Sequence, residues 1–369
     1  MLSHSRNFGL DLVRAIAICL VLLCHFAQQF ELFGFWGVEI FFGLSGFLIG
    51  QILWRNFSQT AQWTPAHIVN FWSRRWWRTI PNYFLFFIIS IVTRIAMGEQ
   101  LPTLSRLTNF LWFGQDLLHR NDDFYGVSWS LCVEEWFYLL FPVGLLLVSM
   151  LRLKHHATFL MTLFLFLAGS VVSRTVLSAN GEVHALTCIT LARLDAIGYG
   201  VAAAFVTHIY KPNGVIKLAA FFTGLVLIAA PFIYGFIAKI PLHQTWGTSL
   251  TLTIVPIGAS LLLPHTTQIT LPTAKLGFIK AIVEKLSLWS YSIYLSHVPI
   301  LFSVYALTGT LRVNTMGNLL SKIAGLGITI LVSALIYKYF ELPFTKKRPA
   351  ELPLLRIATP EKAALPTHS

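Results

Sequence analysis

The chain has 369 residues, of which 56% are hydrophobic and 11% are charged, and its formal net charge is +12. Soluble domains carry about 25% charged residues, so this composition excludes a conventional soluble globule. Repeated apolar runs of about 20 residues predict an all-α, polytopic bundle in the lipid bilayer rather than a barrel. Lys and Arg collect in the cytoplasmic loops of such proteins, so the positive charge does not indicate nucleic acid as a partner.

The hydrophobic runs predict about ten transmembrane helices. They cover, to within a few residues, about 10–30, 36–54, 80–97, 129–151, 157–178, 185–209, 215–237, 246–263, 287–307 and 318–340. The excess of Lys and Arg in alternate connections predicts that both termini are cytoplasmic. Residues 1–348 form the membrane domain in this interpretation, and the polar tail 349–369 is predicted to be disordered.

The first span carries two ionisable residues, Arg14 and His25. Eleven helical steps bring both side chains to nearly the same face, about 16 Å apart along the axis. A charged Arg in a membrane helix costs several kcal/mol, so it should face the bundle interior or a water-filled cavity. Histidine is suited to proton transfer near neutral pH. The alternative is that His25 bonds a neighbouring helix and Arg14 reaches the headgroups.

The second span combines small residues with a charge. Gly43, Gly46 and Gly50 predict close packing against another helix. Glu39 is an intramembrane or interfacial carboxylate.

A basic connector, residues 55–79, follows the second span and contains Arg74, Arg75 and Arg78. Arg74 and Arg78 share a helix face, where their guanidinium groups can fork onto phosphate oxygens. The alternative is an ordinary cytoplasmic positive cluster that neighbouring tryptophans anchor at the interface.

The fourth span follows a polar loop, residues 98–126, that is predicted to face away from the cytoplasm and contains Glu99, Asp116, Asp122 and Asp123. Ser130 and Glu134 lie on one side of this span, near its outer end. A carboxylate there suits a general base or a group that positions a sugar hydroxyl. The alternative is an acidic first turn that complements the helix dipole.

Two later spans also carry polar groups. Arg193 and Asp195 lie within the sixth span, where they form either a functional element or a local polar pair. Tyr294 and His297 in the ninth span face one side of the helix. They indicate either a site or an interfacial aromatic beside a packed histidine. No cysteine has metal-ligand spacing, and we expect no metal site.

These motifs together resemble the membrane-bound acyltransferase-3 family, from about Leu10 to Lys347. The pattern Arg14-x10-His25 and the following GFWGVEIFFGLSGFLI resemble the start of that family. Further matches are Arg75-Trp76-Trp77-Arg78 for the Arg-x-x-Arg motif, VSWSLCVEEWFYLLFP for Trp-Ser-Leu-x-x-Glu, LARLDAIGYG for the Arg-Leu-Asp element, LSLWSYSIYLSHVPIL, and YKYFELPFTKK for the closing element. In the last motif, Glu-Leu-Pro stands where the family more usually has Glu-Arg-Pro or Glu-Lys-Pro.

The resemblance implies an O-acyltransferase of the bacterial inner membrane with no bound cofactor. Acyl-coenzyme A, most often acetyl-coenzyme A, would be the co-substrate, and the acceptor would be a hydroxyl of a cell-surface or lipid-linked glycan. His25 would be the general base or a short-lived acyl carrier, with Arg14 and Glu134 beside it in catalysis. The expected substrate-binding residues are Arg74, Arg75, Arg78, Glu39, Ser130, Arg193, Asp195, Tyr294 and His297.

Two other classes of protein share part of this pattern. A transporter of a glycan or small metabolite would have the same bundle and buried charges, but transporters often show inverted repeats, which we do not find in the sequence. A non-catalytic scaffold of an envelope biosynthetic complex is the third interpretation. Neither requires Arg14, His25 and the arginine cluster to act together.

Overall fold

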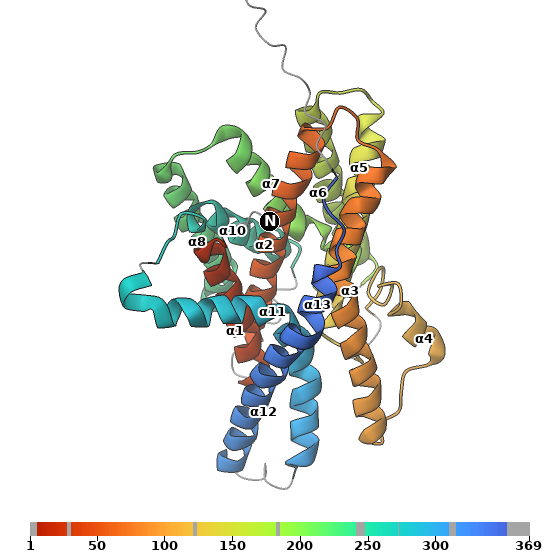
Figure 1. Ribbon diagram of the computed structural model, residues 1–369, viewed down its shortest axis with the longest axis vertical. Coiled ribbons are helices and arrows are strands. Elements are labelled where there is room, and N and C mark those ends of the chain that lie inside the picture. The colour runs from red at the N-terminus through yellow and green to blue at the C-terminus, as the bar shows by residue number, and fades with distance from the viewer. Residues whose placement is uncertain are drawn as a thin grey trace, which may run out of the picture.

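The structure is a computed structural model that describes residues 6–27, 31–120, 124–181, 185–240, 248–271, 273–309 and 315–352 (Figure 1). This part of the chain is all-α, as the composition predicts. The long helices are α1 (Phe8–Phe26), α2 (Glu31–Ser58), α3 (Pro65–Ala96), α5 (Ser128–Ser149), α6 (His155–Ala179), α7 (Leu194–Tyr210), α8 (Gly214–Ile237), α10 (Thr251–Thr266), α11 (Thr273–Leu307) and α12 (Thr315–Ile336). Shorter segments are α4 (Leu104–Asn109), a 3-10 turn (Thr190–Ala192), a π-helical turn (Tyr337–Glu341) and α13 (Leu342–Lys346).

Each predicted span falls on one of the long helices, so the membrane helix bundle is confirmed. In the described ranges, seven helices are long and apolar enough to cross a membrane: α1, Leu32–Ser58 of α2, α3, α5, α6, α8, and Thr315–Lys346. Helices α7 and α10 have 17 and 16 residues, fewer than the roughly 20 that span a hydrocarbon core upright. The count of ten crossings, and the cytoplasmic placement of both termini, stay predictions.

Two predicted boundaries are wrong. The connector 55–79 is mostly helical, because α3 begins at Pro65, a residue that favours the first turn of a helix. The arginine cluster therefore lies within this 32-residue helix. The sixth span does not begin at residue 185. Its backbone instead pairs with the polar loop, where the amide of Thr190 donates to the carbonyl of Asp116 at 2.8 Å, and α7 begins only at Leu194. Asp122 and Asp123 of that loop lie outside the described residues.

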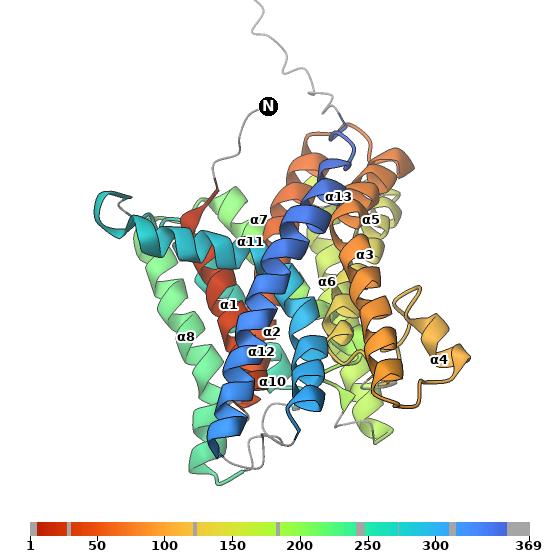
Figure 2. The same ribbon diagram turned by 60° about the horizontal axis from the view of Figure 1, so that its bottom comes forward.

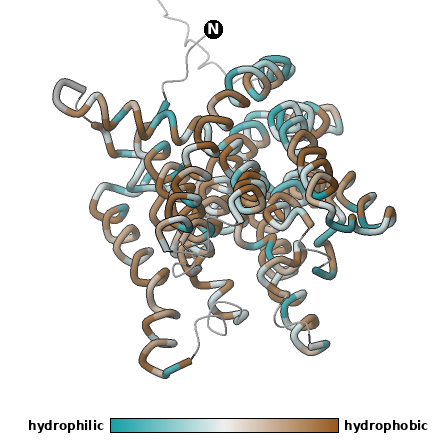
Figure 3. The backbone as a smooth tube through the Cα atoms, turned by 90° about the horizontal axis from the view of Figure 1, so that it is seen from below, coloured by the Kyte–Doolittle hydropathy of each residue, from teal (hydrophilic) through white to brown (hydrophobic). Residues whose placement is uncertain are grey.

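The outer helices present apolar side chains to the surroundings. Phe164 on α6, Val226 on α8 and Leu331 on α12 are 65%, 64% and 61% exposed. In Figure 3 most of the length of the outer helices is coloured hydrophobic. Exposing so much apolar surface to water costs free energy, whereas contact with lipid tails does not. We therefore interpret these faces as the ones that contact the bilayer.

Helix α2 packs against α1, α7 and α10 in the centre of the bundle (Figure 2). Its contact with α7 is close because both helices carry glycine where they meet. A Cβ atom on Gly46 would lie 2.0 Å from the carbonyl oxygen of Ile197, and one on Gly200 would lie 2.2 Å from that of Gly43. Only glycine fits at these two positions, which confirms the close packing predicted from the small residues of α2.

The C-terminal segment returns to the end of the bundle at which α2 ends and α3 begins, which we call the Arg55 end (Figures 1 and 2). Residues 349–352 lie in the predicted disordered tail, but they are described, and Pro349, Ala350 and Glu351 hydrogen-bond to α2 and α3. Residues 353–369 lie outside the described residues.

Candidate functional site

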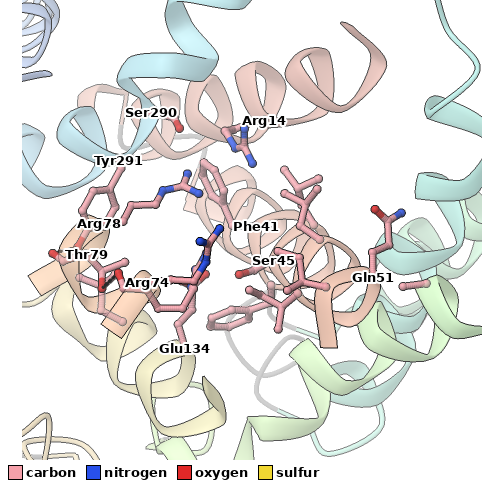
Figure 4. Close-up of a pocket in the computed structure, with 18 of the residues that line it drawn as sticks. Arg14, Phe41, Ser45, Gln51, Arg74, Arg78, Thr79, Glu134, Ser290 and Tyr291 are labelled. Atoms are coloured by element: carbon pink, nitrogen blue, oxygen red, sulfur yellow. Dashed lines mark hydrogen bonds between the residues drawn. The ribbon is translucent and has the colours of Figure 1, made fainter. Parts of the chain in front are cut away.

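A cavity of about 830 Å³ lies among α1, α2, α3, α5, α7 and α11 (Figure 4). It brings together seven predicted site residues: Arg14, Arg74, Arg75, Arg78, Ser130, Glu134 and Tyr294. Five other predicted residues do not line it: His25, Glu39, Arg193, Asp195 and His297. The cavity therefore joins the arginine cluster of α3 to the motif at the start of α5.

The charge of the cavity lining is unbalanced. Seven Lys and Arg side chains line it, against the two carboxylates of Glu134 and Glu351. Arg14 and Arg78 enter from α1 and α3 and point into the same space, where they interact electrostatically (Figure 4). A cavity with this charge excess in a membrane bundle suits a ligand with several negative charges.

The arginines of α3 differ in their surroundings. Arg74 donates from Nη1 to the carbonyl oxygen of Pro349 at 2.8 Å, near the Arg55 end. The Cζ atom of Arg75 lies 4.3 Å from the ring centroid of Tyr138, and its buried Nε has no hydrogen-bond partner among the described atoms. A buried donor without a partner is costly, so this group is available to an anionic ligand in the cavity.

Glu134 lines the same cavity as the arginines of α3. Because α5 begins at Ser128, Glu134 is nearly two turns into the helix. Its Oε2 accepts from the hydroxyl of Tyr138 at 3.1 Å, and that hydroxyl also contacts Ser45 Oγ. These contacts fix the position of the carboxylate at the cavity wall.

Arg14 is held at the cavity wall by the turn before it. Its Nη1 donates to Ser287 Oγ at 3.3 Å and lies 3.8 Å from Asp11 Oδ1. Asp11 also accepts from Arg6 and Ser287, so α1 and α11 are joined through one buried carboxylate. Arg14 is therefore held at the cavity wall by its contacts with Ser287 and Asp11.

The wall that contains Tyr294 separates the cavity from two histidines. Tyr294 OH lies 2.6 Å from Ser130 Oγ, and its ring lies 6.2 Å from that of Phe41. Behind it, the Tyr294 and His297 ring centroids are 5.8 Å apart, and those of His297 and His25 are 4.6 Å apart. Arg14 and His25 both contact α11, through Ser287 and His297, but only Arg14 lines the cavity.

The remaining predicted residues form buried ion pairs away from the cavity. Arg193 contacts Glu39, and Arg174 forks onto Asp195 at 2.9 and 2.8 Å. All four side chains are fully buried. Each pair is neutral by itself, and together the pairs join α2, α6 and α7. This favours a structural role over direct substrate contact.

Several residues of these networks were not singled out from the sequence. Asp11, Ser45, Tyr138 and Arg174 each complete a contact described above. Two of them carry a signal in the sequence: Asp11 lies three residues before Arg14, and Arg174 is a charge inside an apolar span. The other two are an ordinary serine and tyrosine, which only the packing of α2 on α5 brings together.

The chain is similar in sequence to known proteins over most of its length. The family model described as an acyltransferase domain matches residues 7–338. Two similar relatives, both named O-acetyltransferase OatA, come from Staphylococcus aureus strains NCTC 8325 and COL. Each is 26% identical over 370 residues, which is 92% of this chain and 57% of the relative. The chain thus spans little more than half the length of these relatives.

No solved structure matches the chain. The family match covers nearly the whole membrane bundle, including every residue of the cavity wall from Arg14 to Tyr294. The chain belongs to the acyltransferase-3 family.

Proposed function

We propose that this protein is an O-acyltransferase of the bacterial cytoplasmic membrane, which moves an acetyl group from acetyl-coenzyme A to a hydroxyl of a cell-surface or lipid-linked glycan. The observation that carries the proposal is the cavity that combines seven cationic side chains with the Ser130–Tyr294 wall. Coenzyme A carries a diphosphate and a phosphomonoester, which match the arginines in charge. The relatives named O-acetyltransferase support the acetyl group and the hydroxyl acceptor.

The reaction forms a C–O bond from the acceptor hydroxyl to the acyl carbon and breaks the C–S bond of the thioester. The hydroxyl loses its proton, and the departing thiolate gains one. Nδ1 of His25 lies 2.9 Å from the carbonyl oxygen of Val21, and because a carbonyl only accepts, Nδ1 carries the proton. Nε2 then has the free lone pair that a general base requires.

Two groups are candidates to remove the acceptor proton in this proposal. Glu134 lies in the cavity with the arginines, and His25 lies behind Tyr294. We assign the base to His25, because Glu134 is the charge partner of Arg75 and accepts a hydrogen bond from Tyr138. Arg14, Arg75 and Arg78 bind the donor in this proposal, and Ser130, Tyr294 and His297 border the acyl group.

The proposal is tested with membranes from cells that express the chain, supplied with acetyl-coenzyme A labelled in the acetyl group. We expect label in a glycan or lipid-linked fraction, and its loss when Arg78 is replaced by alanine. Label that enters the vesicles without covalent transfer would indicate transport instead. Absence of both transfer and uptake, with the protein present, would contradict the proposed donor.

A further inference from the structure

We propose a phosphate subsite at the mouth of the cavity, by which we mean the part of the cavity at the Arg55 end. The subsite consists of Arg55, Arg74 and Arg348. Glu351 occupies it when no donor is bound. The subsite would take the 3′-phosphomonoester of the donor. This inference rests on the proposed function, because it assumes an acyl-coenzyme A donor. The subsite adds Arg55 and Arg348 to the donor site, and Glu351 as a carboxylate that competes with the phosphate. None of these three residues belongs to the sequence motifs.

The first observation is the position of Glu351. Its Oε1 accepts from Asn56 Nδ2 at 3.0 Å and forms an ion pair with Arg55 Nη2. Both partners belong to the last turn of α2, at the Arg55 end. One oxygen of this carboxylate therefore already sits where two donors converge, as a phosphate oxygen would.

The second observation is that the backbone before Glu351 is fixed to α3. The carbonyl oxygen of Pro349 accepts from Arg74, and that of Ala350 accepts from Asn70 Nδ2 at 2.9 Å. We call residues 349–351 the strap. The strap joins α3 to α2 across the cavity mouth, and both Arg348 and Glu351 line the cavity.

The third observation is the charge at the mouth. Arg74 lies close enough to Arg55, Arg348 and Glu351 to interact electrostatically with all three. Glu351 pairs with Arg55 and also interacts electrostatically with Arg74, while Arg348 adds a further positive charge beside Arg74. Burial alone would raise the pKa of Glu351, but the hydrogen bond from Asn56 and the charge of Arg55 outweigh it and hold that pKa below its ordinary value. The carboxylate is therefore ionised at neutral pH.

A phosphomonoester should displace this carboxylate. It carries a charge of about −2 and three acceptor oxygens, whereas a carboxylate carries −1 and two oxygens. The mouth is also accessible, because the side chains of Arg55 and Glu351 are 35% and 33% exposed. If the thioester reaches the Ser130–Tyr294 wall, the far end of the donor, its adenosine 3′-phosphate, remains at the mouth.

The test compares acetyl-coenzyme A with its 3′-dephospho form in equilibrium binding to the purified full chain. We expect Arg55→Gln to weaken the binding of acetyl-coenzyme A by about tenfold, the loss of one charge-assisted contact, and that of the dephospho form by less than twofold. Glu351→Gln should tighten the binding of acetyl-coenzyme A by several-fold. The unchanged affinity of Arg55→Gln for the dephospho form also shows that the variant is folded.

Two control variants lie at the same end of the bundle but outside the cavity lining. Lys154→Gln removes an exposed cation beside α6. Glu284→Gln removes a carboxylate with 34% side-chain exposure, close to that of Glu351. Neither should change the affinity for acetyl-coenzyme A.

The outcomes separate this inference from the proposed function. If Arg55→Gln weakens both ligands equally or neither, or if Glu351→Gln does not tighten binding, the subsite is wrong while the donor assignment stands. If the unsubstituted chain binds neither ligand, the donor assignment fails, and the subsite fails with it.

Discussion

The imidazoles of His25 and His297 meet edge to face, with ring centroids 4.6 Å apart. Each ring has its Nδ1 beside the carbonyl oxygen of the residue four positions earlier, Val21 at 2.9 Å and Ile293 at 3.2 Å. Both Nε2 atoms are then unprotonated, and Nε2 of His297 has no partner among the described atoms. Two adjacent imidazoles resist a double positive charge, so the pair is suited to take up one proton at a time.

Replacement of His25 tests this role. We expect His25→Ala and His25→Gln to abolish acetyl transfer, because neither alanine nor an amide accepts the hydroxyl proton. The measurement is transfer of labelled acetyl groups by membranes with equal amounts of the protein. Activity within threefold of the unsubstituted chain would remove His25 from the mechanism, and Glu134→Gln would then be the next candidate to measure.

Replacement of Arg75 or Arg78 tests the donor site. We expect Arg75→Ala and Arg78→Ala to raise the KM for acetyl-coenzyme A more than they lower kcat, because contacts to distant phosphates act equally in the ground state and the transition state. Steady-state kinetics over a range of donor concentrations measure both constants. Lys154→Ala is the control. An unchanged KM in both arginine variants would leave this cluster a structural or interfacial feature.

The contact of α2 with α7 gives a matched pair of glycine substitutions. Gly46→Ala should destabilise the protein by about 1–3 kcal/mol, because the added Cβ meets the Ile197 carbonyl. Gly169→Ala on α6 meets no atom within 4 Å and should be neutral or stabilising. Thermal unfolding in detergent compares the two variants. Equal unfolding temperatures would contradict the close packing of these helices.

The buried ion pairs predict a loss of stability without a change in donor binding. Arg174→Ala leaves the Asp195 carboxylate buried without its bidentate partner, which costs about 3–5 kcal/mol. Unfolding in detergent measures the stability, and kinetics measure the donor KM of the protein that remains folded. A stable variant with a raised KM would return Asp195 to the substrate-binding residues.

The sequence predicted the membrane bundle and much of the cavity lining for a physical reason. A charge such as Arg14 is so costly in lipid that its presence in an apolar span places it in the bundle interior. Arg78 was instead predicted from its spacing with Arg74 in the basic connector. The separation of His25 from the cavity was not predictable. A helical wheel places His25 on the same face as Arg14, but it does not show that Tyr294 of α11 lies between His25 and the cavity. The strap was missed for a related reason, since its polar composition indicates disorder and its contacts with Asn56 and Arg74 arise only from the tertiary fold.

The central claim is that the donor enters from the Arg55 end, which the charge distribution predicts to be cytoplasmic. In a background without the four native cysteines, Lys154→Cys and Ser105→Cys on α4 mark the two ends of the bundle for a membrane-impermeant thiol reagent. These labels identify which face is outward in each preparation of sealed vesicles.

Labelled acetyl-coenzyme A, which does not cross a bilayer, is then added to both preparations. The prediction is transfer of label to glycan only in vesicles whose Lys154→Cys position reacts from outside, and its loss with Arg78→Ala. Equal or greater transfer in vesicles whose Ser105→Cys position reacts instead would contradict the assignment of the arginine cavity to a cytoplasmic acyl donor.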